Sequence, residues 1–134
     1  MGGINVELEQ TVTFFNKTGK YIGEITAIYP DHYVVRTLAV LKHPMQGDLH
    51  NPKQVDVDFF HERKALAFRE QTNIPLKMVK PYEGEVPEYK FTLKEAVDKM
   101  IQELSTSDDD FSQKSLDCLK NIQQEYGWMY NIQW

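Results

Sequence analysis

The chain has 134 residues, 41% hydrophobic and 26% charged, which is the balance of a folded protein and excludes an intrinsically disordered one. No apolar run approaches the roughly 18 residues of a membrane span, and the single cysteine excludes a disulfide scaffold. The net charge is −5, with 10 Lys or Arg against 9 Asp or Glu in residues 1–80 and 5 against 11 in residues 81–134, so no strongly basic region favours a nucleic-acid partner.

The first part of the chain predicts three short strands joined by turns. Residues 11–15 are rich in Thr, Val and Phe, which is typical of a strand. Residues 20–28 form the second predicted strand, in which Gly23 marks either a bulge or a close backbone crossing. Residues 32–41 follow a turn at Pro30 and are apolar on both faces, as expected in the interior of a small curled sheet.

The middle of the chain predicts one long loop and two further strands. Residues 42–54 contain two prolines and a glycine, which indicates a loop. Residues 55–59 alternate apolar and acidic side chains, and residues 64–69 continue as a fifth strand around Leu66. Residues 73–91 contain three prolines and therefore predict an irregular connector. Five short strands with one long loop favour an SH3-like barrel over a sandwich, which needs about seven strands.

The last third of the chain predicts a helical hairpin. Thr92 and Glu95 match a capping box, with Phe91 as the hydrophobic staple before the first helix. The acidic residues 108–110 lie where a second helix begins, and Gly127 is a suitable residue to end it. The apolar face of the first helix is formed by Leu93, Ala96, Val97, Met100, Ile101 and Leu104.

The tail, residues 128–134, carries both tryptophans of the chain. We expect it to pack on the barrel rather than to form an exposed apolar patch that awaits a partner, because exposed aromatic side chains promote aggregation. The predicted fold is α+β, a small SH3-like β-barrel over residues 1–80 followed by a connector and a C-terminal α-helical hairpin over residues 81–134. The hairpin is expected to pack on the barrel as one compact unit.

Four histidines within thirty residues raise the question of a metal site. His32, His43, His50 and His61 lie near several carboxylates, and both side-chain types bind zinc or iron. No pair has the helical spacing of a His-x-x-x-His motif, so turn and loop histidines bonded to nearby backbone are the simpler interpretation. A small metal-dependent hydrolase or metal sensor that uses His43, His50 and His61 is the alternative to a protein without an active site.

Other candidates for chemistry also have a simpler structural interpretation. Asp56 and Asp58 share a strand face, as a carboxylate dyad requires, but alternation on a half-buried strand produces such a pair anyway. Cys118 is expected to be a buried helix residue, because a nucleophilic cysteine needs a histidine beside it and the sequence supplies none nearby. Phosphate-binding glycine motifs and the Gly-x-Ser-x-Gly elbow are absent, so we expect no enzyme and no cofactor.

Three long segments carry a family resemblance. They are KTGKYIGE at residues 17–24, LAVLKHP at 38–44 with QGDLHNP at 46–52, and HERKALA at 61–67 with REQTNIP at 69–75. On these strings the sequence resembles the kinase-associated protein B family of spore-forming bacilli, over most of the chain from Gln10 through the helical region. Strings of this length are far more specific than a short catalytic motif.

The resemblance implies a non-catalytic accessory protein that activates or supports a membrane sensor histidine kinase of the sporulation phosphorelay by protein–protein contact. The family is described as a lipoprotein, whereas the first residues here show no signal-peptide pattern and no cysteine. We therefore expect a cytoplasmic protein that reaches the membrane through its kinase partner and does not insert directly. A polar loop stiffened by proline on a barrel suits recognition, and the expected partner-binding residues are Lys42, His43, Asp48, His50, His61, Glu62 and Arg63.

Overall fold

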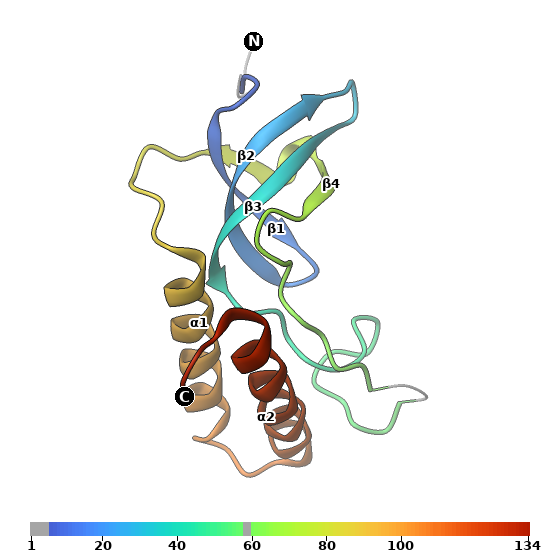
Figure 1. Ribbon diagram of the computed structural model, residues 1–134. Coiled ribbons are helices and arrows are strands. Elements are labelled where there is room, and N and C mark those ends of the chain that lie inside the picture. Colours follow the sequence, from blue (N-terminus) through green and yellow to red (C-terminus); the bar gives the residue numbers. More distant parts are fainter. Residues whose placement is uncertain (1–5, 58–59) are drawn as a thin grey trace.

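A curled β-sheet with two antiparallel helices beneath it makes up the computed structural model, which describes residues 6–57 and 60–134 (Figure 1). Within these residues the sheet has five antiparallel strands in the order β4-β3-β2-β1-β5. In chain order the elements are β1 (Thr11–Asn16), β2 (Gly19–Ile28), β3 (His32–Lys42), β4 (Gln71–Pro75), the 3-10 turn η1 (Leu76–Met78), β5 (Val79–Pro81), α1 (Tyr89–Leu104) and α2 (Asp110–Tyr130).

The sheet curls into a barrel because a very short segment joins its two edge strands. β4 and β5 lie at opposite ends of the strand order, yet only the three residues of η1 separate them in the chain. Three residues span at most about 10 Å, so the two edges must approach each other. The predicted fold class, an SH3-like barrel followed by a helical hairpin, is confirmed.

Three of the five strands lie where the sequence predicts them, and two do not. The strand predicted at residues 55–59 is wrong for residues 55–57, which form bends, while Asp58 and Phe59 lie outside the described residues. The strand predicted at residues 64–69 is also wrong, because that segment has no place in the sheet. The edge strands β4 and β5 come instead from residues 71–75 and 79–81, all but the first two of which lie in the stretch 73–91 predicted as an irregular connector. Their prolines, Pro75 and Pro81, are the last strand residues, and edge strands tolerate proline there.

Gly23 in β2 combines the two features that the sequence left open. The pairing of β2 with β3 shifts register between Ile22 and Gly23, which is a bulge. The backbone of β3 also approaches closely, since a Cβ atom built on Gly23 would lie 2.5 Å from the carbonyl oxygen of Arg36. The absence of a side chain therefore permits both the bulge and the crossing.

Helix α1 begins four residues earlier than predicted, at Tyr89 with Glu88 as its N-cap, and Thr92 does not cap it. Thr92 is buried, and its Oγ1 accepts a hydrogen bond from the Val40 amide at 3.0 Å while donating to the Tyr89 carbonyl at 2.8 Å. Its hydroxyl thus ties the helix to β3. Phe91, predicted as a staple, is 66% exposed. The capping-box prediction is wrong because a threonine that serves a neighbouring strand looks the same in sequence as one that serves its own helix.

Helix α2 begins as predicted but ends later. Asp109 is its N-cap, and the Asp109 carboxylate accepts from the Ser112 amide at 2.8 Å. The predicted end at Gly127 is wrong, since the helix continues to Tyr130 and Asn131 follows in the left-handed conformation with φ of 55°. The chain then turns back on the helix, where a Cβ atom on Gly127 would lie 3.2 Å from the Ile132 carbonyl oxygen. Gly127 therefore makes room for the returning tail.

The tail packs partly on the helices and leaves one tryptophan in solvent. Ile132 is buried, and the Trp134 indole nitrogen donates to the Gln123 carbonyl at 2.9 Å. The Nζ atom of Lys94 on α1 lies 5.4 Å from the centre of the Trp134 ring. Trp128, in contrast, is 82% exposed. The tail thus contacts α1 and α2, and its Ile132 also belongs to the hydrophobic cluster that includes strand residues.

One hydrophobic cluster joins the barrel to both helices. The predicted apolar face of α1 is confirmed at its four most buried positions, and Ile122 and Tyr126 of α2 meet the same cluster. Because strands and helices share these side chains, the hairpin holds a defined position on the barrel. The buried members from the strands include Val12, Phe14, Tyr21, Ile25, Val35, Val40, Ile74 and Val79, and those from α1 include Leu93, Ala96 and Val97.

Candidate interaction surface

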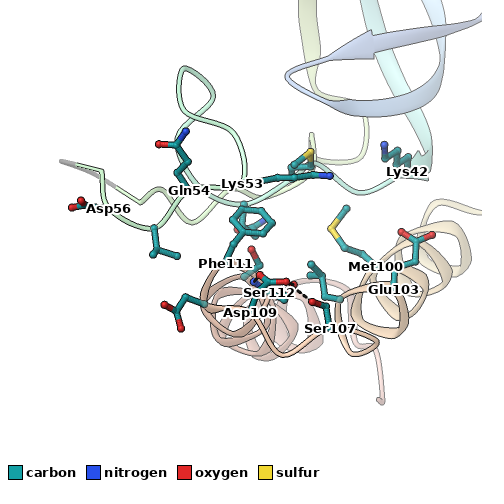
Figure 2. Close-up of a pocket in the computed structure, with 16 residues that line it drawn as sticks. Lys42, Lys53, Gln54, Asp56, Met100, Glu103, Ser107, Asp109, Phe111 and Ser112 are labelled. Carbon is teal, nitrogen blue, oxygen red and sulfur yellow. Dashed lines mark hydrogen bonds between the residues drawn. The ribbon is translucent and has the colours of Figure 1, made fainter.

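Two grooves border the segment that links β3 to β4. The first, here called the helix-tip groove, lies between residues 42–56 and the adjacent ends of α1 and α2, and has a volume of about 860 Å³ (Figure 2). The second, here called the tyrosine groove, lies between the β1–β2 turn, residues 61–67 and the end of α2, with a volume of about 590 Å³. We call residues 43–57 the long loop. It contributes to the walls of both grooves.

The base of the long loop is held by His43, which is completely buried. Its Nδ1 lies 2.9 Å from the Pro44 carbonyl oxygen, and its Nε2 lies 2.9 Å from the Tyr126 hydroxyl. A carbonyl oxygen only accepts, so Nδ1 carries the proton and donates it. Nε2 then accepts from the Tyr126 hydroxyl. Both ring nitrogens are therefore engaged, and neither is available to a metal ion or a partner.

Burial lowers the pKa of His43 to about 4, although the hydrogen bond to the Pro44 carbonyl opposes the shift. An imidazole without contact to water cannot hydrate its charged form, which is why the neutral form is favoured. At neutral pH the ring is uncharged and stays in the tautomer described above. His43 thus acts as a fixed hydrogen-bonding element of the interior.

The stability of the protein is expected to fall by about 2 kcal/mol between about pH 7.5 and about pH 5 because of His43. The unfolded chain binds a proton near the ordinary histidine pKa of about 6.5, whereas the folded chain does not bind one until about 4. Lowering the pH through this window therefore favours the unfolded state. Urea unfolding at both pH values measures the loss, and His43→Gln should remove it. Equal pH dependence in parent and variant would contradict the assignment to His43.

Three buried tyrosines fasten residues 65–66 to the barrel and helices. The Ala65 amide donates to the Tyr126 hydroxyl at 2.8 Å, and the Leu66 amide donates to the Tyr21 hydroxyl at 3.3 Å. The Tyr89 hydroxyl donates to the Leu66 carbonyl at 2.5 Å. Burial raises the pKa of each of these three tyrosines, that of Tyr21 to about 12, so the hydroxyls stay protonated. For Ala65 and Leu66, these hydroxyls therefore take the place of a partner strand.

Gln46 joins the long loop to residues 61–63. Its side-chain nitrogen donates to the Arg63 carbonyl at 2.8 Å, and its side-chain oxygen accepts from the Arg63 amide at 2.7 Å. The Gly47 amide donates to the His61 carbonyl at 2.9 Å. The Gln46 side chain thus pairs with the Arg63 backbone as a residue on a neighbouring β-strand would. As a result, two segments predicted to carry the contact residues are held side by side.

The structure separates the seven predicted contact residues into three groups. His61, Glu62 and Arg63 line the tyrosine groove, and Lys42 lines the helix-tip groove. Two others shape the long loop itself. The Asp48 carboxylate accepts from the His50 amide at 2.9 Å and from the Asn51 side chain at 3.0 Å, which is an Asx turn that leaves His50 exposed. His43, the seventh, lies in the interior as described.

The alternative of a metal site receives no support from this geometry. Among the described residues, no group of three or more His, Cys, Asp or Glu side chains lies close enough to hold a metal ion. The predicted carboxylate dyad of Asp56 and Asp58 stays a prediction, because Asp58 lies outside the described residues. Cys118 is half-buried, and burial raises the pKa of its thiol, which keeps it in the weakly nucleophilic protonated form.

Sequence reasoning missed Gln46 and Tyr126, which hold the surface in place. Gln46 bonds to a residue 17 positions away, and Tyr126 bonds to His43, 83 positions away. Contacts at such separations leave no periodic pattern in a single sequence, whereas helix and strand signals do. The one related signal is the helical period of α2, in which Tyr126 shares a buried face with Leu116, Leu119 and Ile122.

No helix in the described part of the chain is long and apolar enough to cross a membrane. The fold and surface define an SH3-like barrel with an appended helical hairpin and two open grooves. The family model described as kinase associated protein B matches residues 16–127 of this chain. The chain therefore belongs to the kinase-associated protein B family, which confirms the resemblance noted in the sequence.

Two relatives illustrate how closely the chain follows this family. It is 56% identical over 120 residues to kinase-associated lipoprotein B of Bacillus subtilis (strain 168), which covers 90% of this chain and 94% of that protein. It also matches the crystal structure of kinase-associated protein B from Bacillus cereus with a TM-score of 0.78 and 45% identity, covering 91% of this chain and 98% of the other. Both similarities span the barrel and the helical hairpin.

Proposed function

We propose that the protein is a non-catalytic accessory protein that contacts a membrane sensor histidine kinase of the sporulation phosphorelay and raises its activity. Membership of a family named for its association with a kinase carries this proposal. The arrangement of Gln46 and Arg63 supports it, because their paired hydrogen bonds hold two polar segments side by side on a rigid scaffold. A surface held in place before binding loses less conformational entropy when a partner docks.

Such a protein needs no reactive group, only unequal affinity for two states of the kinase. If it binds the active conformation more tightly, mass action shifts the kinase toward that conformation. The proposed contact residues are Lys42 together with His61, Glu62 and Arg63, which line the two grooves. We place the protein on the cytoplasmic side, held at the membrane through this contact. The Bacillus subtilis relative is named a lipoprotein, but the proposed function of this chain requires only the contact with the kinase.

The test is affinity purification of a membrane histidine kinase from detergent-solubilised membranes of sporulating cells. The tagged parent protein is compared with Arg63→Glu, which reverses a charge in the tyrosine groove. The matched control is Lys120→Glu, the same charge change at an exposed position of α2 outside both grooves. We expect the parent and the control to recover the kinase and Arg63→Glu to recover at least about tenfold less, a difference of about 1.4 kcal/mol.

The purified kinase then provides the functional measurement. Its autophosphorylation rate should rise when the parent protein is added and should rise less with Arg63→Glu at the same concentration. All three proteins must first show the same thermal unfolding midpoint. Recovery of no histidine kinase by any of them, or an unchanged rate with the recovered kinase, would refute the proposal.

A further inference from the structure

The helix-tip groove has an apolar floor that the rest of the described chain leaves partly uncovered. Figure 2 shows Phe111, on the first turn of α2, between the helices and the long loop, and Met100 on α1, which lines the same groove. Methionine adapts its shape to different apolar partners, which suits a binding floor. The apolar side chains that line the groove are Met45, Val55, Met100, Leu104 and Phe111, of which only Met100 is buried.

The rim of the same groove is predominantly acidic. Its carboxylates are Asp56, Glu103, Asp109 and Asp110, against the two lysines Lys42 and Lys53. The hydroxyl of Ser107, followed by the amide of Ser112, holds the pKa of Asp109 below its usual range, so this carboxylate stays charged. None of these six side chains forms an ion pair within residues 6–57 and 60–134. The excess negative charge is therefore available to a partner.

One polar group in the wall of the groove also lacks a partner. Ser115 of α2 is 1% exposed, and its hydroxyl has no hydrogen bond to any described residue. A buried hydroxyl without a partner costs free energy. The groove thus combines an apolar floor, an acidic rim and an unsatisfied hydroxyl.

We infer that the helix-tip groove binds a segment of the kinase partner in which apolar side chains are flanked by lysine or arginine. Apolar side chains of the segment cover Phe111 and the two methionines, and its cations face Glu103 and Asp110 on the rim. An apolar face laid into a groove supplies affinity, while complementary charges at the rim select the partner and its register. The identity of the partner as a kinase rests on the function proposed above.

A membrane kinase offers such a segment where its transmembrane helix leaves the bilayer. Cytoplasmic flanks of transmembrane helices are enriched in lysine and arginine, directly after an apolar stretch. The acidic rim fits this pattern, and it would repel an acidic segment. We therefore assign the groove to the cytoplasmic juxtamembrane segment of the kinase.

The probe for the groove is a fluorescein-labelled 18-residue amphipathic peptide of leucine and lysine, titrated with the full-length protein and followed by fluorescence anisotropy. We expect saturable binding that a leucine–glutamate peptide of the same pattern does not show. Glu103→Lys should weaken binding at least about tenfold, since it reverses a charge on the rim. Phe111→Ala, which removes part of the floor, should weaken it by a similar factor.

The matched control is Glu85→Lys, which makes the same charge change at an exposed position between β5 and α1 outside both grooves. We expect its affinity for the peptide to stay within about twofold of the parent, after correction for salt by titration at two ionic strengths. An equal loss in Glu85→Lys and Glu103→Lys would show general attraction to an acidic protein and would overturn the inference. Absence of saturable binding to the parent would also overturn it.

Sedimentation of the parent and Glu103→Lys tests whether a second copy of the chain fills the groove. Self-association of the parent that Glu103→Lys abolishes would assign the groove to a dimer and refute the kinase segment as its occupant. The peptide titration needs no kinase, so its result is independent of the purification experiment. A recovered kinase without peptide binding refutes this inference alone, whereas peptide binding without a recovered kinase refutes the proposed function.

Discussion

Replacing Tyr126 by phenylalanine is expected to lower the free energy of unfolding by about 3 kcal/mol. The Tyr126 hydroxyl serves two groups, donating to Nε2 of His43 at 2.9 Å and accepting from the Ala65 amide at 2.8 Å. Phenylalanine keeps the buried ring but leaves both groups without a partner. Each unsatisfied group costs roughly 1 to 3 kcal/mol when it is buried. Urea unfolding at neutral pH measures the difference.

Tyr29→Phe is the matched control for this change. Tyr29 is 50% exposed and stacks on His32 through its ring, so losing the hydroxyl there should alter stability by less than about 0.5 kcal/mol. If Tyr126→Phe and Tyr29→Phe unfold at the same urea concentration, the hydroxyl does not hold the base of the long loop. A second readout separates the site from global stability, since loss of the Ala65 contact should speed amide exchange at residues 65–66.

Replacing Gly23 by alanine is expected to lower the free energy of unfolding by about 3 kcal/mol. An added Cβ atom would lie 2.5 Å from the Arg36 carbonyl oxygen, 2.7 Å from a Val35 methyl group and 2.8 Å from the Phe14 ring. The carbonyl belongs to the backbone of the paired strand β3, so it cannot rotate away. The strands must separate or the bulge must be lost, and both changes disturb the centre of the sheet. Thermal or urea unfolding provides the measurement.

Gly84→Ala is a control with a similar contact distance and a different neighbour. Its Cβ atom would lie 2.5 Å from the Tyr82 hydroxyl oxygen, which is the far end of a half-buried side chain that can turn aside. A cost below about 1 kcal/mol is therefore expected there. Equal losses for the two substitutions would mean that the crossing of β2 and β3 tolerates a methyl group, contrary to the reason given for Gly23.

The candidate surface was partly predictable because composition identified its loops. Proline, glycine and polar residues in the long loop indicated an irregular, exposed segment, and Lys42, His61, Glu62 and Arg63 do line grooves. The helix-tip groove itself was not predictable. Its walls combine the long loop with the ends of α1 and α2, and nothing in a single sequence states that these segments meet.

Elements whose signals are local could be predicted from the amino-acid sequence alone. Strands β1 to β3 follow from β-branched and aromatic runs between turn residues, the inward face of α1 follows from its helical period, and the start of α2 follows from the acidic residues 108–110. Each of these signals depends on residues within a few positions of one another. The family resemblance likewise rested on contiguous strings, and the comparison with relatives confirmed it.

Features that depend on partners distant in the chain could be seen only in the three-dimensional structure. The sequence predicts Thr92 as a helix cap, but its hydroxyl accepts a hydrogen bond from the Val40 amide, 52 positions away. The sequence predicts His43 as a surface residue, but it is buried and hydrogen-bonded to Tyr126, 83 positions away. The pattern of residues 64–69 predicts a strand, but tyrosine hydroxyls bond to the backbone of Ala65 and Leu66, while the Arg69 amide bonds to β3 at the Thr37 carbonyl. A buried polar group must find a partner wherever the fold provides one, and that choice is made in space rather than along the sequence.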